Sequence, residues 1–426
     1  MLQYSSRRFD KFSSKTVRSH DSGIALLKPR TKTAVFTDNE RYNFDMNEIA
    51  SKQVNSVDRL AERLKYARIS MKLTLVDVES QTSVGSSTLS EFENGKREPR
   101  LPQLKELADL YRRSTSFFMS DEPLPVEIVL WRQKPSSPQV EEIQAQLLRL
   151  IEQYHRLEQW CDSFEQVNLP SVSGDPARFT YQQAEKLAHD FRNSNGLGER
   201  PGQSLLRVLE EVSKIKVFHM PFEPSGSAAC TFHEQFGGAI LLNSQNVRWR
   251  RNFDLAHELF HLLTWKVFRR AGEPTFGESS PHEEKLATCF ARHLLMPQET
   301  IQIAIGMQVG ERTKLSFEDL FEIARQFDVS IEALLWQMSF VYRLSKQWVL
   351  ENTEKLRDRI SFWDKRQHDV PPVRPLRFEA LANEALRRGM ISTGKYAEYV
   401  GITRREAMRQ IEQEAHDDAE VEIAHP

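Results

Sequence analysis

One segment, FDLAHELFHLL at residues 253–263, constrains the fold of this chain more than any other. Its apolar residues recur at helical spacing, with Leu255 and Leu259 on one face, so we expect a buried helix here. His257 and His261 lie four positions apart, and residues at this spacing share one face of a helix. Both imidazoles can therefore reach a single metal ion.

Glu258 follows the first histidine and completes the pattern HExxH. A zinc ion lowers the pKa of a bound water to about 7, and a neighbouring carboxylate can then take its proton. We therefore expect His257 and His261 to be metal ligands and Glu258 to be the general base of peptide-bond hydrolysis. The alternative is an ordinary helix whose histidines bind no metal. The apolar segment AILLN at 239–243 precedes the helix, and we expect it to offer a sheet edge along which substrate lies.

A catalytic zinc site also needs a third protein ligand and an open position. The next helical segment, 282–297, provides the candidates. We expect Glu284 to be the third ligand because it lies on the inward side of this helix, and its neighbour Glu283 is the fallback. His282 and His293 are also close in sequence, but we expect His293 to be structural because it shares a face with Glu284 only loosely.

These two segments resemble the ImmA/IrrE family of metallopeptidases. Members of that family have an HExxH helix after a strand that ends in Asn, followed by a helix that contains E-x-x-A and ends in LLMP. The resemblance implies that His257, His261 and Glu284 hold the metal and that Glu258 is the base. Zn²⁺ is the implied ion, with Mn²⁺ as the alternative. The match covers roughly residues 178–300 and rests on Asn243, Glu284, Ala287, Phe290, Ala291 and the run 294–297.

Two positions depart from the pattern of this family. Thr288 stands where the family has Asn, at a position that helps to orient a ligand, and a Thr hydroxyl can still form a hydrogen bond there. Phe260 stands where the family often has Gly, so we expect its ring to narrow the approach to the site. Neither change removes a ligand.

A second informative pattern lies upstream, at 73–111, where two short helical segments are separated by a tight turn. The second helix opens with Ser86, Ser87 and Thr88, and small polar residues at a helix N-terminus let backbone N–H groups approach phosphate. Lys96, just after this helix, can reach a neighbouring phosphate. The arrangement predicts a helix-turn-helix whose second helix enters the major groove of DNA.

This pattern resembles the Xre/Cro-type repressor family over about residues 57–119. The resemblance implies a double-stranded DNA operator as partner and, from repressor geometry, a homodimer. Residues 57–113 contain 11 Lys and Arg against 9 Asp and Glu, so we expect modest phosphate affinity from this part alone. The alternative is a helix-turn-helix fold that binds protein instead. The residues expected at the DNA are Thr74, Ser86, Ser87, Thr88, Glu91, Lys96 and Arg97.

The remaining segments complete a prediction of the fold class, which is mainly α with a small β-sheet (α+β). Residues 1–35 carry eight Lys and Arg against two Asp, which predicts a basic arm that is either a solvated tail or a phosphate contact. A long helix at 139–167 is expected as a core or dimer face, and 391–411 as a structural or partner-docking helical pair rather than a second DNA-binding motif.

Strands are expected at 215–222 and 237–243, and helices at 178–212, 248–268 and 282–296. The expected domains are a basic arm at 1–55, the helix-turn-helix at 56–122, a linker with the long helix at 123–175, the peptidase at 176–312 and a helical C-terminal subdomain with an acidic tail at 313–426.

Composition excludes several classes of protein. The chain has 426 residues, a net charge of -2 and 39% hydrophobic residues, so it is neither a polycation nor wholly disordered. Its three cysteines form no CxxC pair, which is typical of a reducing compartment. The sequence contains no apolar run of about 18 residues and starts without an apolar signal core, so we expect a cytoplasmic protein with no membrane partner.

Three functions are compatible with these features. The first is a DNA-binding regulator with a zinc-dependent peptidase that cleaves a repressor protein, or its own linker at 120–140, to switch gene expression, often after stress in the family it resembles. The second is a transcription factor whose second half senses a ligand or partner without hydrolysis. The third is an antitoxin or phage-type repressor that mainly binds a protein. Glu258 favours the first function, because a binding domain needs no general base.

Overall fold

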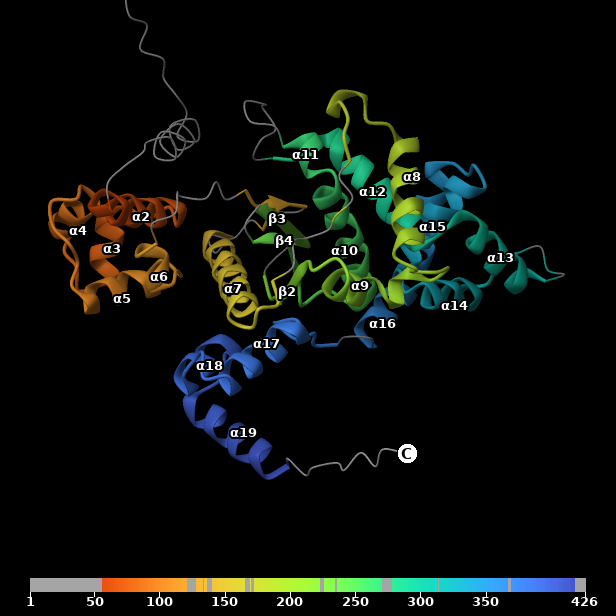
Figure 1. The fold of residues 1–426 in the computed structure, drawn as a ribbon. Coiled ribbons are helices and arrows are strands. Elements are labelled where there is room, and N and C mark those ends of the chain that lie inside the picture. The colour runs from red at the N-terminus through yellow and green to blue at the C-terminus, as the bar shows by residue number, and fades with distance from the viewer. Residues whose placement is uncertain are drawn as a thin grey trace, which may run out of the picture. The chain divides into compact units, whose positions relative to one another are not determined.

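The computed structural model describes residues 56–120, 128–132, 134–135, 140–164, 169, 172–222, 226–233, 236–269, 278–310, 312, 314–366 and 369–417 (Figure 1). The basic arm predicted at 1–55 lies outside the described residues, as does the acidic tail after residue 417. The predicted fold class is confirmed, because helices dominate the described chain and its strands form one small sheet. Within these ranges, no helix combines the length and the apolar character that crossing a bilayer requires.

The first group of helices forms the predicted helix-turn-helix. Its members are α2 (Ser56–Ser70), α3 (Leu75–Gln81), α4 (Ser86–Glu93), α5 (Leu101–Leu110) and α6 (Thr115–Phe118). The Thr74 side chain caps the N-terminus of α3, and a short turn separates α3 from α4 as expected. Leu64 of α2 is fully buried in the core of this group. Leu89 and Phe92 of α4, three residues apart and so on one face of that helix, are also fully buried.

The sheet has the strand order β1-β3-β4-β2. The strands are β1 (Leu130–Trp131), β2 (Lys216–Met220), β3 (Ala228–His233) and β4 (Gly237–Asn243). β2 is parallel to β4, whereas β3 is antiparallel to β4 and β1 is antiparallel to β3. The strand predicted at 237–243 is therefore central, and the expectation that 239–243 offers a sheet edge is wrong. The reason is that β3 pairs with β4 along one side, joined through Gly237 with its positive φ of 77°.

Helices cover both faces of the sheet. All residues of β2 and β4 are buried as a result, and in β3 only the last two, Phe232 and His233, are partly exposed. Neighbouring strand residues point to opposite faces, so Val217 and Ile240 join one core and Phe218 and Leu241 join the other. Figure 1 shows these two layers on either side of the strands. On the first side lies α10 (Arg248–Leu263) with α12 (Pro281–Leu295) and α8 (Tyr181–Ser194) packed behind it, and on the second side lie α7 (Val140–Trp160) and α17 (Leu376–Arg387).

The long helix predicted at 139–167 is α7, which ends earlier than expected, at Trp160. Leu147 and Tyr154 on its apolar side are buried in the second core, so this side is a core face. The helical pair predicted at 391–411 consists of α18 (Thr393–Val400) and α19 (Arg404–Asp417), and Tyr399 is buried in the same core, which supports a structural role. The other helices are η1 (Pro176–Arg178), η2 (Pro201–Gln203), α9 (Leu205–Glu211), α11 (Trp265–Phe268), α13 (Gln298–Val309), α14 (Phe317–Phe327), α15 (Ile331–Val341) and α16 (Lys346–Arg366).

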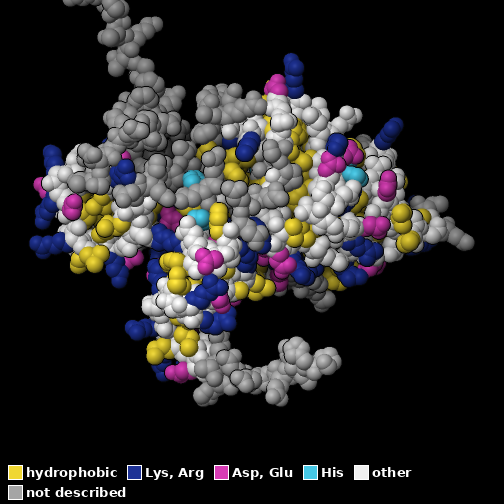
Figure 2. All heavy atoms as spheres, viewed as in Figure 1, with side chains coloured by type: hydrophobic (Ala, Val, Ile, Leu, Met, Phe, Trp, Pro, Cys, Tyr) yellow, Lys and Arg dark blue, Asp and Glu magenta, His cyan; other side chains and the backbone are white. Residues whose placement is uncertain are grey.

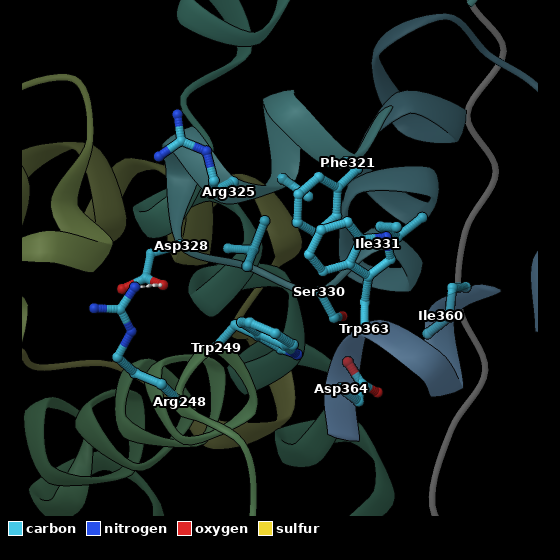
Figure 3. A pocket seen from close by; sticks show the side chains of 12 residues that line it. Arg248, Trp249, Phe321, Arg325, Asp328, Ser330, Ile331, Ile360, Trp363 and Asp364 are labelled. Atoms are coloured by element: carbon cyan, nitrogen blue, oxygen red, sulfur yellow. Dashed lines mark ion pairs between the residues drawn. The ribbon is translucent and has the colours of Figure 1, made fainter. Parts of the chain in front are cut away.

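A cavity of about 60 Å³ lies where the first turn of α10 meets α14, α15 and α16 (Figure 3). Trp249, Phe321 and Trp363 line it, and the rings of the last two stack with their centroids 4.0 Å apart. Arg248 and Asp328, which also line it, form an ion pair of 2.9 Å. None of the lining residues is a histidine of α10, so this cavity is separate from the candidate metal centre.

Candidate metal centre and helix-turn-helix surface

Helix α10 carries the HExxH segment through the interior of the protein. The exposed fractions of His257, Glu258 and His261 are 1%, 0% and 2%, so all three side chains are withdrawn from bulk water. The segment is helical because its leucines contact both the sheet and α12, and burial of these apolar side chains stabilises the helix here. The spacing of four residues places both imidazole rings on the side of α10 that faces the first turn of α12.

Helix α12 brings the acidic residues to the histidines. The Ser280 side chain caps its first turn by accepting a hydrogen bond from the backbone N–H of Glu283, and Pro281 occupies the first turn, where it needs no donor. Glu284 Oε2 then lies 3.0 Å from His257 Nε2, and its Oε1 lies 3.4 Å from His261 Nε2. One donor atom from each of these three residues lies within 4.8 Å of the other two.

The donor set and the surrounding polar atoms fit a divalent metal. Two imidazole nitrogens and one carboxylate oxygen are the ligands of known catalytic zinc sites, which leave a fourth position open. Both carboxylate oxygens of Glu258 are buried, and among the described residues no nitrogen or oxygen donates a hydrogen bond to them, while the Cys230 thiol, a weak donor, lies close by. Such groups are costly to bury without a partner, and a water or substrate at the open position of a bound metal would supply one. Ser279 Oγ contacts Glu284 Oε1 and holds that carboxylate in place.

The protonation of the site follows from burial and from the acidic neighbours. Burial, helped by the charge of Arg132, lowers the pKa of His257 to about 3, which keeps the ring in the neutral form that binds metals. Burial also disfavours a charge on His261, but hydrogen bonds with Glu283 and Glu284 outweigh it and raise its pKa to about 9. Burial raises the pKa of Glu258 to about 7, a value suited to a group that exchanges a proton near neutral pH.

Glu283, the fallback ligand, lies on the far side of the His261 ring. Its Oε1 is 2.8 Å from His261 Nδ1 and 2.6 Å from Nη2 of Arg269, and both carboxylate and guanidinium are about 1% exposed. Glu283 therefore orients His261 so that Nε2 faces Glu284. A carboxylate behind a ligating histidine is common at metal sites, where it fixes the tautomer and the ring orientation. The sequence alone could not tell whether Glu283 orients His261 or binds the metal. Glu283 and Glu284 are consecutive residues of α12, and only the direction in which each side chain leaves the helix separates the two roles.

Thr288 forms the hydrogen bond expected of its hydroxyl, but with the backbone of Glu284, and the expectation for Phe260 is wrong. The Thr288 hydroxyl donates to the backbone carbonyl of Glu284 at 2.9 Å, one turn earlier, and does not orient the carboxylate. The Phe260 ring does not narrow an approach, because it is fully buried and packs against aromatic rings in the core. Those rings belong to Phe179, Phe268 and Phe290.

The two histidines of α12, His282 and His293, are not part of the group formed by His257, His261 and Glu284. His282 Nε2 is 2.9 Å from the backbone oxygen of Phe179. The His293 ring packs edge-on against Phe340, as expected for a structural residue. Sequence reasoning missed Arg132, whose guanidinium pairs with Asp254 of α10, because no spacing rule relates residues so far apart.

The helix-turn-helix residues predicted at DNA divide into two groups. Ser86, Ser87 and Thr88 form the first turn of α4, and the exposed Lys96 follows that helix, as the prediction requires. Figure 2 shows Lys and Arg side chains spread over this group of helices among a few acidic ones. Gly85, with no side chain, occupies the cap position of α4.

The other predicted residues have protein partners. The Thr74 hydroxyl donates to Asp77 Oδ2 at 2.6 Å and accepts from the Asp77 N–H at 3.1 Å, so this side chain is engaged in capping α3. Glu91 and Arg97 are both exposed and lie 4.0 Å apart as an ion pair, so the arginine partly offsets the acidic charge of α4.

Comparison with known proteins agrees with the two resemblances. Residues 210–339 match the IrrE N-terminal-like domain (peptidase family M78), and residues 64–118 match a helix-turn-helix family. The fusion of the two parts, in this order, is therefore confirmed. The first match extends through α14 and most of α15, while the domain boundary at 312 stays a prediction. No curated protein matches the chain.

Proposed function

We propose that this chain is a DNA-bound regulator whose zinc-dependent peptidase half cleaves a repressor protein, or its own linker at 120–140, to switch gene expression. The proposal rests on one observation: His257, His261 and Glu284 converge beside the buried carboxylate of Glu258. A fused helix-turn-helix favours regulation over bulk digestion. We further propose a double-stranded DNA operator, a homodimer on it and action in the cytoplasm. A non-hydrolytic sensor or antitoxin is the second candidate, but binding a ligand or partner without hydrolysis does not require a general base such as Glu258.

The chain's own residues divide the work of peptide hydrolysis. His257, His261 and Glu284 would hold the zinc ion, with Mn²⁺ as the alternative, and when bound the ion polarises a carbonyl and acidifies a water. Glu258 takes a proton at a carboxylate oxygen and delivers it to the leaving amine. Glu283 and Arg269 keep the His261 ring in one orientation. The buried walls around these groups exclude bulk water.

Metal removal tests the peptidase half. The purified protein is expected to contain about one zinc or manganese ion per chain and to cleave a candidate repressor, or itself, to a defined fragment. A chelator should stop cleavage, and added metal should restore it. Cleavage that continues at full rate in metal-depleted protein, or metal-loaded protein that leaves every candidate and its own chain intact, would overturn the proposal.

The DNA half is tested through the salt dependence of binding. We expect Lys96→Ala to weaken binding to a random-sequence duplex and to lower the slope of log affinity against log salt by about 0.9, because one phosphate contact is lost. Fluorescence anisotropy over a salt series measures both quantities. The matched control is Lys355→Ala, which removes an exposed lysine from α16 and should change neither. Equal slopes for the Lys96 variant and the control would remove Lys96 from the DNA interface.

A further inference from the structure

The outer edge of β3 is occupied by a segment of the linker. Leu130 is paired with Cys230 and Trp131 with Ala229, both antiparallel, and the Arg132 N–H donates to the Ala228 carbonyl at 3.1 Å. This is how an extended peptide adds a strand to a sheet edge. β1 has only two residues, so few ladder hydrogen bonds hold it in place.

The linker segment also reaches the helix that carries the candidate metal ligands. The Arg132 guanidinium pairs with Asp254, three residues before His257 on α10, and lies 5.2 Å from the centroid of the Phe253 ring. The Asp254 side chain is 2% exposed and that of Arg132 is 22% exposed. A carboxylate buried to this extent is strongly disfavoured without a cationic partner. Any peptide that replaces the linker here is therefore expected to supply a positive side chain.

The two faces of β1 place its apolar side chains differently. Leu130 joins the core on the side of α10, on the same face as its cross-strand neighbour Cys230. Trp131 points to the other face, where its ring packs edge-on against Phe222 with the centroids 5.6 Å apart. The edge thus recognises a pattern of side chains and not only a backbone.

We propose that the β3 edge and Asp254 form the binding site for an extended peptide that carries an apolar residue two positions before an arginine, and that the linker occupies this site in cis. The proposal rests on the peptidase function and names the substrate class of that site. Asp254 is then the residue that selects for arginine. Substrate and linker compete for the same edge of β3. The linker strand β1 therefore inhibits the peptidase until a substrate peptide displaces β1 from this edge.

Peptide binding tests the competition without requiring catalysis. The full chain carrying Glu258→Gln is mixed with a fluorescein-labelled peptide of the linker sequence VEIVLWRQKP, and anisotropy measures its affinity. Adding Arg132→Ala should raise the affinity at least about tenfold, because a tethered competitor acts at a high effective concentration. The same peptide with its arginine replaced by alanine should bind more weakly. Adding Asp254→Asn to the Arg132→Ala chain should abolish the difference between the two peptides.

The matched control is Arg149→Ala, which breaks an ion pair with Glu398 from a side chain that is also 22% exposed, on α7. It should leave peptide affinity unchanged. If Arg132→Ala folds and binds the peptide no better than the control does, β1 is a fixed strand and the proposal fails. If Arg132→Ala does not fold, hydrogen exchange of the Glu258→Gln chain decides: excess peptide must speed exchange at the Arg132 amide, and unchanged exchange overturns the proposal. Because hydrolysis is not measured, these results are independent of whether the peptidase is active.

Discussion

Glu258→Gln is expected to lower the rate of peptide cleavage by about 10²–10⁴-fold while the protein keeps its fold and its metal. The substitution preserves the size of a side chain that is fully buried, so packing around it changes little. It removes the carboxylate that we propose as the proton acceptor, and among the described residues the two other carboxylates beside the histidines, Glu283 and Glu284, are already paired with them. Single-turnover cleavage and metal analysis on the same preparation measure the two effects.

Glu283→Gln gives the complementary result. Because this carboxylate holds His261 Nδ1 from behind, we expect metal affinity to fall by about 10–100-fold, with cleavage recovering when metal is in excess. Glu299→Gln, which changes an exposed carboxylate on α13, is the control for both variants. A Glu258→Gln protein that cleaves at the unsubstituted rate would show that Glu258 is not the base. A loss of metal in that variant would place its carboxylate among the ligands.

The parts of the structure that could be predicted from the sequence depend on contacts between close neighbours in the chain. Four-residue spacing places His257 and His261 on one face of α10, and the segment is apolar enough to be a buried helix. The turn before Ser86 separates two short helices in the same way. Predicting that Glu284 meets the histidines also required knowing that α12 packs beside α10, which no local contact determines. The helical periodicity of residues 282–297 and the family resemblance together predicted this packing.

The features that could not be predicted depend on pairings between distant segments. β3 contains the run Ala228-Ala229-Cys230, which has weak strand propensity, and it is a strand because β4 and β1 flank it. Arg132 and Asp254 lie 122 residues apart, and only the fold brings them together. Likewise, Phe260 could not be assigned to the core in advance, because the rings around it come from three other segments.

A buried ion pair between α7 and β2 provides the largest expected change in stability. Lys216 Nζ lies 3.0 Å from Glu158 Oε2, and the two side chains are 2% and 1% exposed. Arg377 Nη1 lies 2.5 Å from the other oxygen of the same carboxylate. The Lys216 ammonium also donates to the Phe236 carbonyl at 2.9 Å and lies 5.0 Å from the centroid of the Tyr154 ring. Burial lowers the pKa of Lys216, and the nearby Glu158 charge opposes that shift.

Glu158→Gln is therefore expected to lower the free energy of unfolding by about 3–5 kcal/mol, because it leaves a buried ammonium without its counter-charge. Urea unfolding followed by tryptophan fluorescence measures the change. Glu211→Gln removes an exposed carboxylate that pairs with Arg207 on α9, and we expect it to cost less than about 1 kcal/mol. The double variant Glu158→Leu, Lys216→Met should regain part of the loss, since it removes the almost fully buried ammonium together with its counter-charge, whereas the partly exposed Arg377 keeps uncharged acceptors such as the Ser163 carbonyl. If Glu158→Gln behaves like the Glu211 control, Lys216 sheds its proton or reaches water in the folded protein, and the pair does not stabilise the contact between α7 and β2.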